Sequence, residues 1–261
     1  MLVGVRAAHH PGFDRVVFDF RGGLPARRDV GWVPALVGDG SGEPVPVAGR
    51  AVLQVRFESA DAHDAAGDPT APGRLAFALP NVVSVVRSGD FEAVTTYGIG
   101  LARRQPFRVS TLRSPDRVVV DVDAAFRTVP RRVWFFDEGR FLRNEEPFFV
   151  PVTRQVVPGA PATGVLDRVF AGPTAAEHAR GLRLVASGAT GFDRLSISGG
   201  TARVRLVGGC SSGGSTVTVA GHLLPSLHQF PAVRRVEVLD PAGRTGRPGG
   251  PGDSVPECLE P

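Results

Sequence analysis

The chain has 261 residues, which corresponds to one or two domains at about 150 residues each. Gly and Pro make up about a fifth of it, below the ~25–30% typical of low-complexity chains. With 42% hydrophobic residues it can form one or two ordinary cores. All 30 basic residues are Arg, which excludes P-loop and Schiff-base chemistry, because both need a Lys.

The formal net charge of +4 is small, and the arginines occur singly or in pairs rather than in long runs. This pattern does not indicate nucleic-acid binding. We expect most of these side chains to be solvated at strand ends and turns. Attraction to an anionic polymer surface, such as a cell wall or acidic lipid, is the alternative.

The first half of the chain has the pattern of short strands separated by turns. Between 15 and 20, Val16, Phe18 and Phe20 alternate with residues that face the other way. The predicted strands are 2–8, 15–20, 31–37, 50–57, 81–87, 93–101, 107–112 and 117–122. Since no amphipathic helix interrupts them, we predict an all-β sandwich or barrel. Small, acidic and turn-forming residues over 59–74 predict a long mobile loop.

A connector over 126–132 leads into a region with a different periodicity. Aromatic and apolar residues predict strands over 133–136 and 148–156, with a polar loop over 137–146 between them. Apolar residues then recur at helical spacing over 163–170, which predicts a helix.

Thr174 and Glu177 have the spacing of a capping box, so we expect a short helix to start there. A hairpin is predicted across Gly199-Gly200. The spacing over 216–230 predicts another helix, which Pro225 should kink or leave irregular in its first turns. A strand over 233–239 follows. We therefore predict an α+β domain with two helices packed on a small mixed sheet.

The two cysteines, Cys210 and Cys258, lie in a Gly/Ser-rich loop and in the C-terminal tail. Neither belongs to a CxxC pair or lies at zinc-finger spacing from a His, so a metal site is not indicated. We predict a disulfide that holds the tail, 241–261, which would otherwise be loose. Such a bond would indicate an oxidising compartment, whereas two free thiols in a cytosolic protein are the alternative.

The N-terminal residues have no charged leader and no apolar region of signal-peptide length. No apolar run approaches the ~18 residues of a membrane span. We expect an extracytoplasmic protein whose export segment is carried by the complete gene product, because of the cysteines. A cytosolic protein is the alternative.

Residues 131–240 resemble the GerMN domain, the sporulation and spore-germination family of bacterial envelope proteins. The resemblance is carried by VWFFDEG (133–139), VPVTRQV (150–156), VFAGPTAAEHARGL (169–182), LSISGGTARVRL (195–206) and HQFPAVRRVEVL (228–239). It implies a fold similar to the ring-building motif and a role in assembly, with a possible homo-oligomer or envelope complex, rather than an enzyme. The loop 208–214 departs from the family pattern and, with the SVPECLEP ending, resembles actinobacterial members.

Residues 1–125 resemble the AMIN-like β-domain that often precedes GerMN modules in envelope lipoproteins. The matching segments are GVRAAHHPGFDRVVFDF (4–20), GDFEAVTTYGIGL (89–101) and PFRVSTLRSPDRVVVDVD (106–123). This resemblance implies a β-sandwich that attaches to peptidoglycan. A lipobox cysteine, which a lipoprotein requires, is not found near the N-terminus of this sequence.

Few residues are candidates for chemistry. His9 and His10 lie at a strand-to-turn junction with Asp14 nearby, where we expect a solvated turn rather than a metal site. His222 and His228 are six residues apart on opposite sides of a predicted helix, so they cannot share a metal ion, and we expect surface or packing roles for them.

Other polar groups give weaker signals. Cys210 could act as a nucleophile with His222 or His228 as its base, but a disulfide explains both cysteines. The loop 208–214 could cradle a phosphate, yet it lacks a Lys and the spacing of a nucleotide fingerprint. The pairs Glu145-Glu146 and Asp121/Asp123 are typical of loop and strand-end charges. The aromatic residues of 134–136 and 148–149 should be core, or otherwise a subunit-contact patch.

We predict a non-catalytic, exported cell-envelope protein without a cofactor, metal site or nucleic-acid partner. The β-sandwich would bind the cell wall or a partner, and the GerMN-like module would mediate assembly or scaffolding. The alternative is an accessory subunit or enzyme of peptidoglycan hydrolysis.

Overall fold

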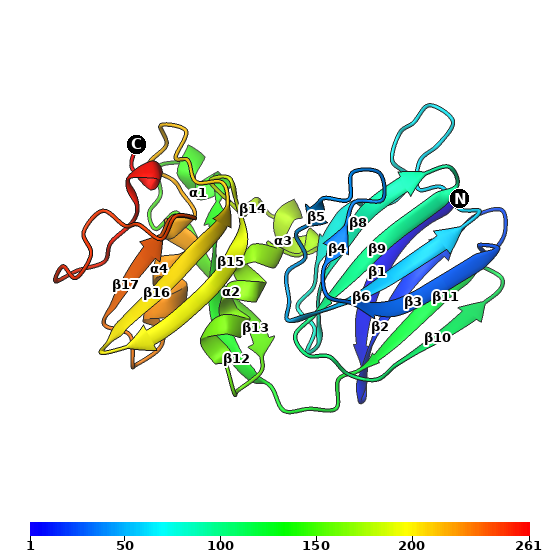
Figure 1. Ribbon diagram of the computed structural model, residues 1–261, viewed down its shortest axis with the longest axis horizontal. Coiled ribbons are helices and arrows are strands. Elements are labelled where there is room, and N and C mark those ends of the chain that lie inside the picture. Colours follow the sequence, from blue (N-terminus) through cyan, green and yellow to red (C-terminus); the bar gives the residue numbers. More distant parts are fainter. The chain divides into compact units, whose positions relative to one another are not determined.

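The computed structural model describes residues 1–261, which divide into two compact units (Figure 1). The N-terminal unit is Met1–Thr128 and the C-terminal unit is Val129–Pro261. The division falls within the connector that the sequence predicts over 126–132. None of the helices has the length and apolar character that crossing a bilayer requires.

The N-terminal unit is built from two antiparallel sheets and a short hairpin. The first sheet has the order β1–β2–β11–β10, formed by Leu2–His10, Phe13–Phe20, Arg117–Asp123 and Phe107–Leu112. The second has the order β3–β6–β9–β8–β7, formed by Arg27–Val33, Ala51–Glu58, Val94–Leu101, Val82–Phe91 and Arg74–Ala76. The hairpin pairs β4 (Leu36–Val37) with β5 (Pro44–Val45).

The inner faces of these two sheets share one hydrophobic core. Phe18 of β2 meets Phe57 of β6 edge to face, with ring centroids 5.0 Å apart, and Tyr97 of β9 at 5.6 Å. This arrangement follows from the alternation in the sequence, because the alternate residues from Val16 to Phe20 in β2 and from Tyr97 to Leu101 in β9 are apolar and point inward. The sheets therefore pack face to face.

Two details of this unit differ from the sequence-based expectation. The predicted strand 31–37 is broken into β3 and β4 around Pro34, which has no backbone N–H to donate to a ladder. The loop over 59–74 is irregular, as its composition indicates, but Ala60, Ala62 and Ala71 are buried in the core. Their small side chains let the loop lie against the sheets.

The C-terminal unit has two three-stranded sheets and short helices. One sheet has the order β13–β12–β14, formed by Phe149–Val156, Val129–Asp137 and Leu182–Arg183. The other has the order β15–β16–β17, formed by Ala189–Ser198, Thr201–Gly208 and Arg235–Leu239. The helices are α1 (Glu138–Leu142), α2 (Pro161–Ala171), α3 (Ala175–Ala179), α4 (Ala220–His228) and the 3-10 turn η1 (Glu257–Leu259).

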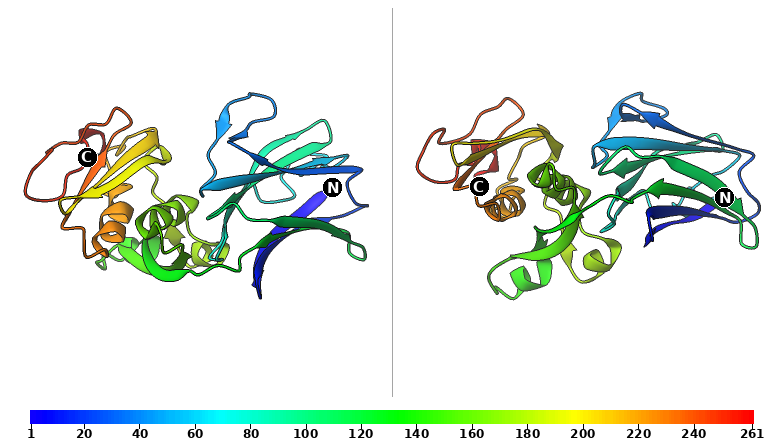
Figure 2. Two further views of the ribbon diagram at one scale, coloured as in Figure 1. Left: turned by 60° about the horizontal axis from the view of Figure 1, so that its bottom comes forward. Right: turned by 90° about the horizontal axis from the view of Figure 1, so that it is seen from below.

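The structure differs here from the single mixed sheet that the sequence predicts. In the β15–β16–β17 sheet, β16 pairs antiparallel with β15 and parallel with β17. Strand β12 pairs with β13 and β14 instead, so it belongs to a second sheet. Helices α2 and α4 contact strands of both sheets and form a layer between them (Figure 2).

The ends of the helices can be compared with the capping residues and helix breakers in the sequence. The predicted capping box of α3 is present: Thr174 and Glu177 satisfy each other's backbone N–H. Residues 216–219 are not helical, and Pro225 lies inside α4. The sequence predicts a polar loop over 137–146, but α1 forms there because the Asp137 side chain caps the N–H of Arg140.

Candidate functional site

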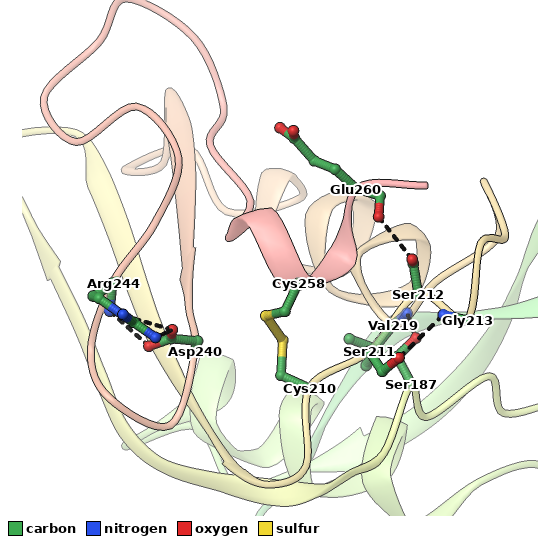
Figure 3. Close-up of a disulfide and its surroundings, with 10 residues drawn as sticks. All are labelled: Ser187, Cys210, Ser211, Ser212, Gly213, Val219, Asp240, Arg244, Cys258 and Glu260. Carbon is green, nitrogen blue, oxygen red and sulfur yellow. Dashed lines mark hydrogen bonds and ion pairs between the residues drawn. A yellow bond between two sulfur atoms is a disulfide. The ribbon is translucent and has the colours of Figure 1, made fainter.

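The C-terminal tail is joined to the body of its unit by a disulfide between Cys210 and Cys258 (Figure 3). Hydrogen bonds next to the disulfide also join the loop 208–214 to the tail. The N–H of Ser212 donates to the carbonyl of Cys258 over 2.7 Å, and the Ser212 hydroxyl donates to the carbonyl of Glu260 over 2.7 Å. The loop 208–214 therefore binds the tail, and α4 begins only at Ala220, so the loop is not the phosphate cradle at a helix N-terminus considered above.

The expectation that the disulfide alone holds the tail is wrong. Ser254 exchanges backbone hydrogen bonds with Val236 and Val238 of β17, each 2.9 Å long. Asp253 accepts the N–H of Val236 over 2.7 Å and lies 2.8 Å from Nε2 of His228. The tail thus adds a short parallel bridge to the edge of the β15–β16–β17 sheet.

The two N-terminal histidines contact neighbours within their own sheet. His9 Nδ1 lies 2.7 Å from Oδ1 of Asp14, a fully buried carboxylate that also accepts the N–H groups of Asn81 and Val82. His10 stacks on Phe13 with ring centroids 5.0 Å apart. Asp14 therefore connects the two sheets of the unit, which the solvated-turn expectation did not include.

His222 is fully buried in the C-terminal unit. Its Nδ1 donates to the carbonyl of Trp134 over 2.8 Å, and its Nε2 accepts the N–H of Val185 over 2.9 Å. Burial lowers the pKa of His222 to about 4, so it is neutral near pH 7. Both ring nitrogens are used by backbone groups, which makes His222 a packing residue rather than a base or ligand.

Of the four carboxylates singled out in the sequence, Asp121, Asp123 and Glu145 are bonded to nearby groups. Asp121 accepts two hydrogen bonds from Arg15, of 2.7 and 2.8 Å, and Asp123 accepts the N–H of Ala125. Glu145 pairs with Arg143, whose hydrogen bond holds the pKa of Glu145 below its ordinary value. These are the strand-end and loop charges that their positions in the sequence indicate.

Asp61, His63 and Asp90 have ligand atoms within 4.8 Å of one another, a grouping that the sequence analysis did not find. Asp90 already accepts the N–H of Ala62 over 2.8 Å, and its Oδ2 lies 2.9 Å from His63 Nδ1. The guanidinium of Arg87 also lies 3.3 Å from this carboxylate. A metal ion would have to displace that positive charge. We therefore interpret the grouping as a set of hydrogen bonds that join the loop over 59–74 to β8.

The aromatic residues near the start of the C-terminal unit are divided between core and surface. Phe135 and Phe136 are buried, whereas Phe148 and Phe149 are half-buried. On the adjoining helix α1, two apolar side chains are exposed: Phe141 and Leu142, at 45% and 79%. The surface patch that we weighed as an alternative to core thus includes residues outside the predicted aromatic strands.

A hollow of about 420 Å³ opens at one end of the N-terminal unit, where β3 ends and β6 begins. This is within the size range of small-ligand sites. Its charged lining residues are both arginines. The lining consists of Trp32, Val33, Pro34, Ala35, Leu36, Val45, Val47, Gly49, Arg50, Ala51, Val52 and Arg104.

One wall of the hollow is the segment around β4 and β5, which lies directly on strand β9. A Cβ at Gly98 would be 2.7 Å from a methyl of Leu36, and one at Gly100 would be 2.1 Å from the carbonyl of Ala48. The two glycines occupy alternate positions and so leave one face of β9 bare. Gly49, at φ +136°, likewise approaches the backbone of Leu101 too closely for any side chain. The hollow depends on these close approaches.

Trp32 and Arg104 form the other prominent feature of the hollow. The guanidinium carbon of Arg104 lies 5.0 Å from the centre of the Trp32 ring, within the range of cation–π attraction. Trp32 in turn packs edge to face on Phe107 of β10, with centroids 5.8 Å apart. The half-buried ring is thereby held between the two sheets, and the exposed guanidinium is held by the ring.

A smaller hollow of about 290 Å³ lies at the start of β10, and its lining includes Asp121, Asp123 and Arg108. Since Arg15 pairs with Asp121, positive and negative charges are balanced around it. The first hollow is lined by positive charge alone and is therefore the candidate binding site.

Comparison with known proteins identifies the N-terminal unit. Its residues 1–124 match the AMIN-like domain family. They form an AMIN-like domain. The structure of the tandem GerMN domains of the sporulation protein GerM from Bacillus subtilis is also similar, at 18% identity and a TM-score of 0.34. That match covers 54% of this chain and 50% of the other, so the chain spans about half of that protein's length. No curated protein matches.

Sequence reasoning did not find the hollow of the AMIN-like domain. Trp32 and Arg104 are 72 residues apart and carry no motif. The one usable signal is the alternation of Gly98 and Gly100 within a strand, because such glycines often mark the close approach of another backbone.

Proposed function

We propose that the protein is a non-catalytic, extracytoplasmic component of a bacterial cell envelope that binds the cell wall through its AMIN-like domain. AMIN-like domains are associated with peptidoglycan-related functions. The observation that carries the proposal is the match over residues 1–124, together with a hollow in that domain whose charged lining is entirely positive. Peptidoglycan carries carboxylates, which such a lining attracts.

The cysteines support an extracytoplasmic location. Cys210 and Cys258 are bonded to each other in the structure, and such bonds persist in oxidising compartments. The sandwich of the N-terminal unit and the α+β arrangement of the C-terminal unit fit the AMIN-like plus GerMN-like organisation that the sequence resemblance implies.

For the C-terminal unit we propose an assembly or scaffolding role. The sequence resemblance to GerMN domains motivates it, and the exposed Phe141 and Leu142 of α1 supply apolar surface that a partner or a second copy could cover. Light scattering of the full chain over a range of concentrations tests this role. A species larger than the monomer is expected, and a monomer at every concentration contradicts it.

A pull-down with purified peptidoglycan sacculi, run beside a turbidity-clearing assay, tests the main proposal on the full chain. We expect the protein to sediment with the sacculi in a salt-dependent manner and to leave the turbidity unchanged. Clearing would favour the alternative, an enzyme of peptidoglycan hydrolysis. Failure to sediment would overturn the wall-binding role.

A further inference from the structure

We propose that the hollow beside Trp32 is a carboxylate-binding site and that Arg104 is its principal cation. The inference rests on the proposed function and deepens it, since it names the group of the wall polymer that the AMIN-like domain recognises. The expected ligand is a carboxylate group attached to an uncharged or weakly polar chain, as in the peptide-bearing units of peptidoglycan.

The first step of the argument is the position of Arg104. Its guanidinium lies over the indole of Trp32, and Trp32 is itself fixed against Phe107. Attraction between a guanidinium and an aromatic ring does not use up the N–H groups of the guanidinium, which can still donate to a ligand. A guanidinium held in this way can bind a carboxylate through two parallel hydrogen bonds, and less side-chain entropy is lost on binding because the stem is already ordered.

The second step is the charge of the lining. Arg50 belongs to the same hollow, and the remaining lining residues are uncharged. The backbone of Arg50 is fixed beside the hollow, because its N–H donates to the carbonyl of Leu101 over 2.7 Å next to the close approach at Gly49. Because no acidic residue lines the hollow, nothing in the lining opposes the charge of Arg104, and this favours an anionic group as ligand.

The third step concerns the rest of the ligand. The lining also includes Val33, Pro34, Val45 and Val47, which offer apolar contacts. A carboxylate flanked by uncharged sugar or peptide atoms would place its charge beside Arg104 and its uncharged atoms against these apolar residues.

The test measures binding of a soluble disaccharide-peptide fragment of peptidoglycan to the full-length chain by calorimetry. Arg104→Gln removes the charge, and we expect affinity to fall about tenfold or more. Arg104→Lys should be intermediate, because an ammonium keeps the charge but loses the stacked, two-pronged geometry. Thermal unfolding of each variant checks that the fold is kept.

Arg103→Gln is the matched control. Arg103 is the next residue, is exposed and also lies over an aromatic ring, that of Phe126 at 5.3 Å, but it does not line the hollow. The control changes the net charge by the same amount, so we expect its affinity to stay within about twofold of the parent chain's. Equal losses at positions 103 and 104 would show a general charge effect and overturn the site.

The chemistry of the probe gives the second readout. When the carboxylates of the fragment are converted to amides, the parent chain should bind it as weakly as Arg104→Gln does, and the variant should not weaken further. A glycerol-phosphate oligomer that bound more tightly than the fragment, and through Arg104, would overturn the carboxylate assignment.

Failure of the site and failure of the proposed function are distinguishable. If Arg104→Gln bound the fragment as the parent chain does while both still sedimented with sacculi, the site would be wrong and the wall-binding role would stand. If the parent chain neither bound the fragment nor sedimented, both would be wrong.

Discussion

Arg154 of β13 and Glu177 of α3 form an ion pair in the interior of the C-terminal unit, with side chains only 2% and 10% exposed. Nη1 of Arg154 donates to Oε1 of Glu177 over 2.8 Å. Oε2 of Glu177 also accepts the N–H of Thr174 as part of the α3 capping box. Burial alone would raise the pKa of Glu177, but its bonds with Arg154 and Thr174 hold this pKa below its ordinary value. The pair therefore fastens α3 to the sheet.

Replacing Arg154 with Met leaves the carboxylate of Glu177 buried without its cation. We expect the free energy of unfolding of the C-terminal unit to fall by about 3–5 kcal/mol in urea denaturation at pH 7. Arg205→Met is the matched control, because Arg205 also lies on a strand and pairs with an acid, Asp193, but at the surface. Arg205→Met should lower the free energy of unfolding much less. Equal losses in the two variants would show that the interior position of the Arg154–Glu177 pair does not matter.

The buried, neutral state of His222 predicts that the free energy of unfolding depends on pH. Its pKa is about 4 in the folded protein and close to the ordinary value of 6.5 when unfolded. Between these values the unfolded chain binds a proton that the folded chain does not. The contribution to stability is therefore complete above pH 6.5 and is lost as the pH falls toward 4, by up to about 3 kcal/mol.

The measurement is the free energy of unfolding at several pH values between 7 and 4.5 for the parent chain and for His222→Gln. The difference between the two should shrink as the pH falls, because carboxylates and other histidines titrate equally in both. His63, whose pKa is raised by Asp90, contributes in the opposite sense, being stabilising when protonated. A difference independent of pH would contradict the neutral, buried state of His222.

The sequence predicts the strands of the AMIN-like domain well because alternation of apolar residues is a local property. Long helices such as α2 are equally visible, since their apolar residues repeat at helical spacing. The short helix α1 is not, because a single cap by Asp137 decides it within a polar segment. The hollow is also hidden, because Trp32 and Arg104 meet only through the pairing of distant strands.

The alternating glycines of β9 are a sequence feature that indicates the close approach of another segment. In Gly98-Ile99-Gly100 the residue between the glycines points into the core, and the glycines leave the opposite face to Leu36 and Ala48. Glycine weakens a strand unless another segment must come close, so their alternation indicates a covering segment. It does not indicate which segment covers them, because that depends on the tertiary fold.

Gly100→Ala tests this contact. The new methyl group would lie 2.1 Å from the carbonyl oxygen of Ala48 and 2.7 Å from the hydroxyl of Ser84, so the segment that forms the wall must move. We expect a loss of stability of about 1–3 kcal/mol together with weaker binding at the hollow, from thermal unfolding and calorimetry. Gly31→Ala in β3, where nothing lies within 4 Å, should leave both nearly unchanged. Similar effects at the two positions would contradict the role assigned to the close approach.

The last prediction separates the two ways in which the tail is held. Replacing both Cys210 and Cys258 with Ser opens a loop closed across 48 residues, and we expect the free energy of unfolding to fall by about 4 kcal/mol on the chain-entropy model. The tail should nevertheless stay in place, because Ser254 remains bonded to β17 and Asp253 to His228. Limited proteolysis of the tail should therefore stay slow in the double-Ser variant and become faster when Asp253→Ala is added, because this change removes the bonds to His228 and to the N–H of Val236 and leaves only the Ser254 bridge. Rapid cleavage in the double-Ser variant alone would show that the disulfide is the dominant anchor.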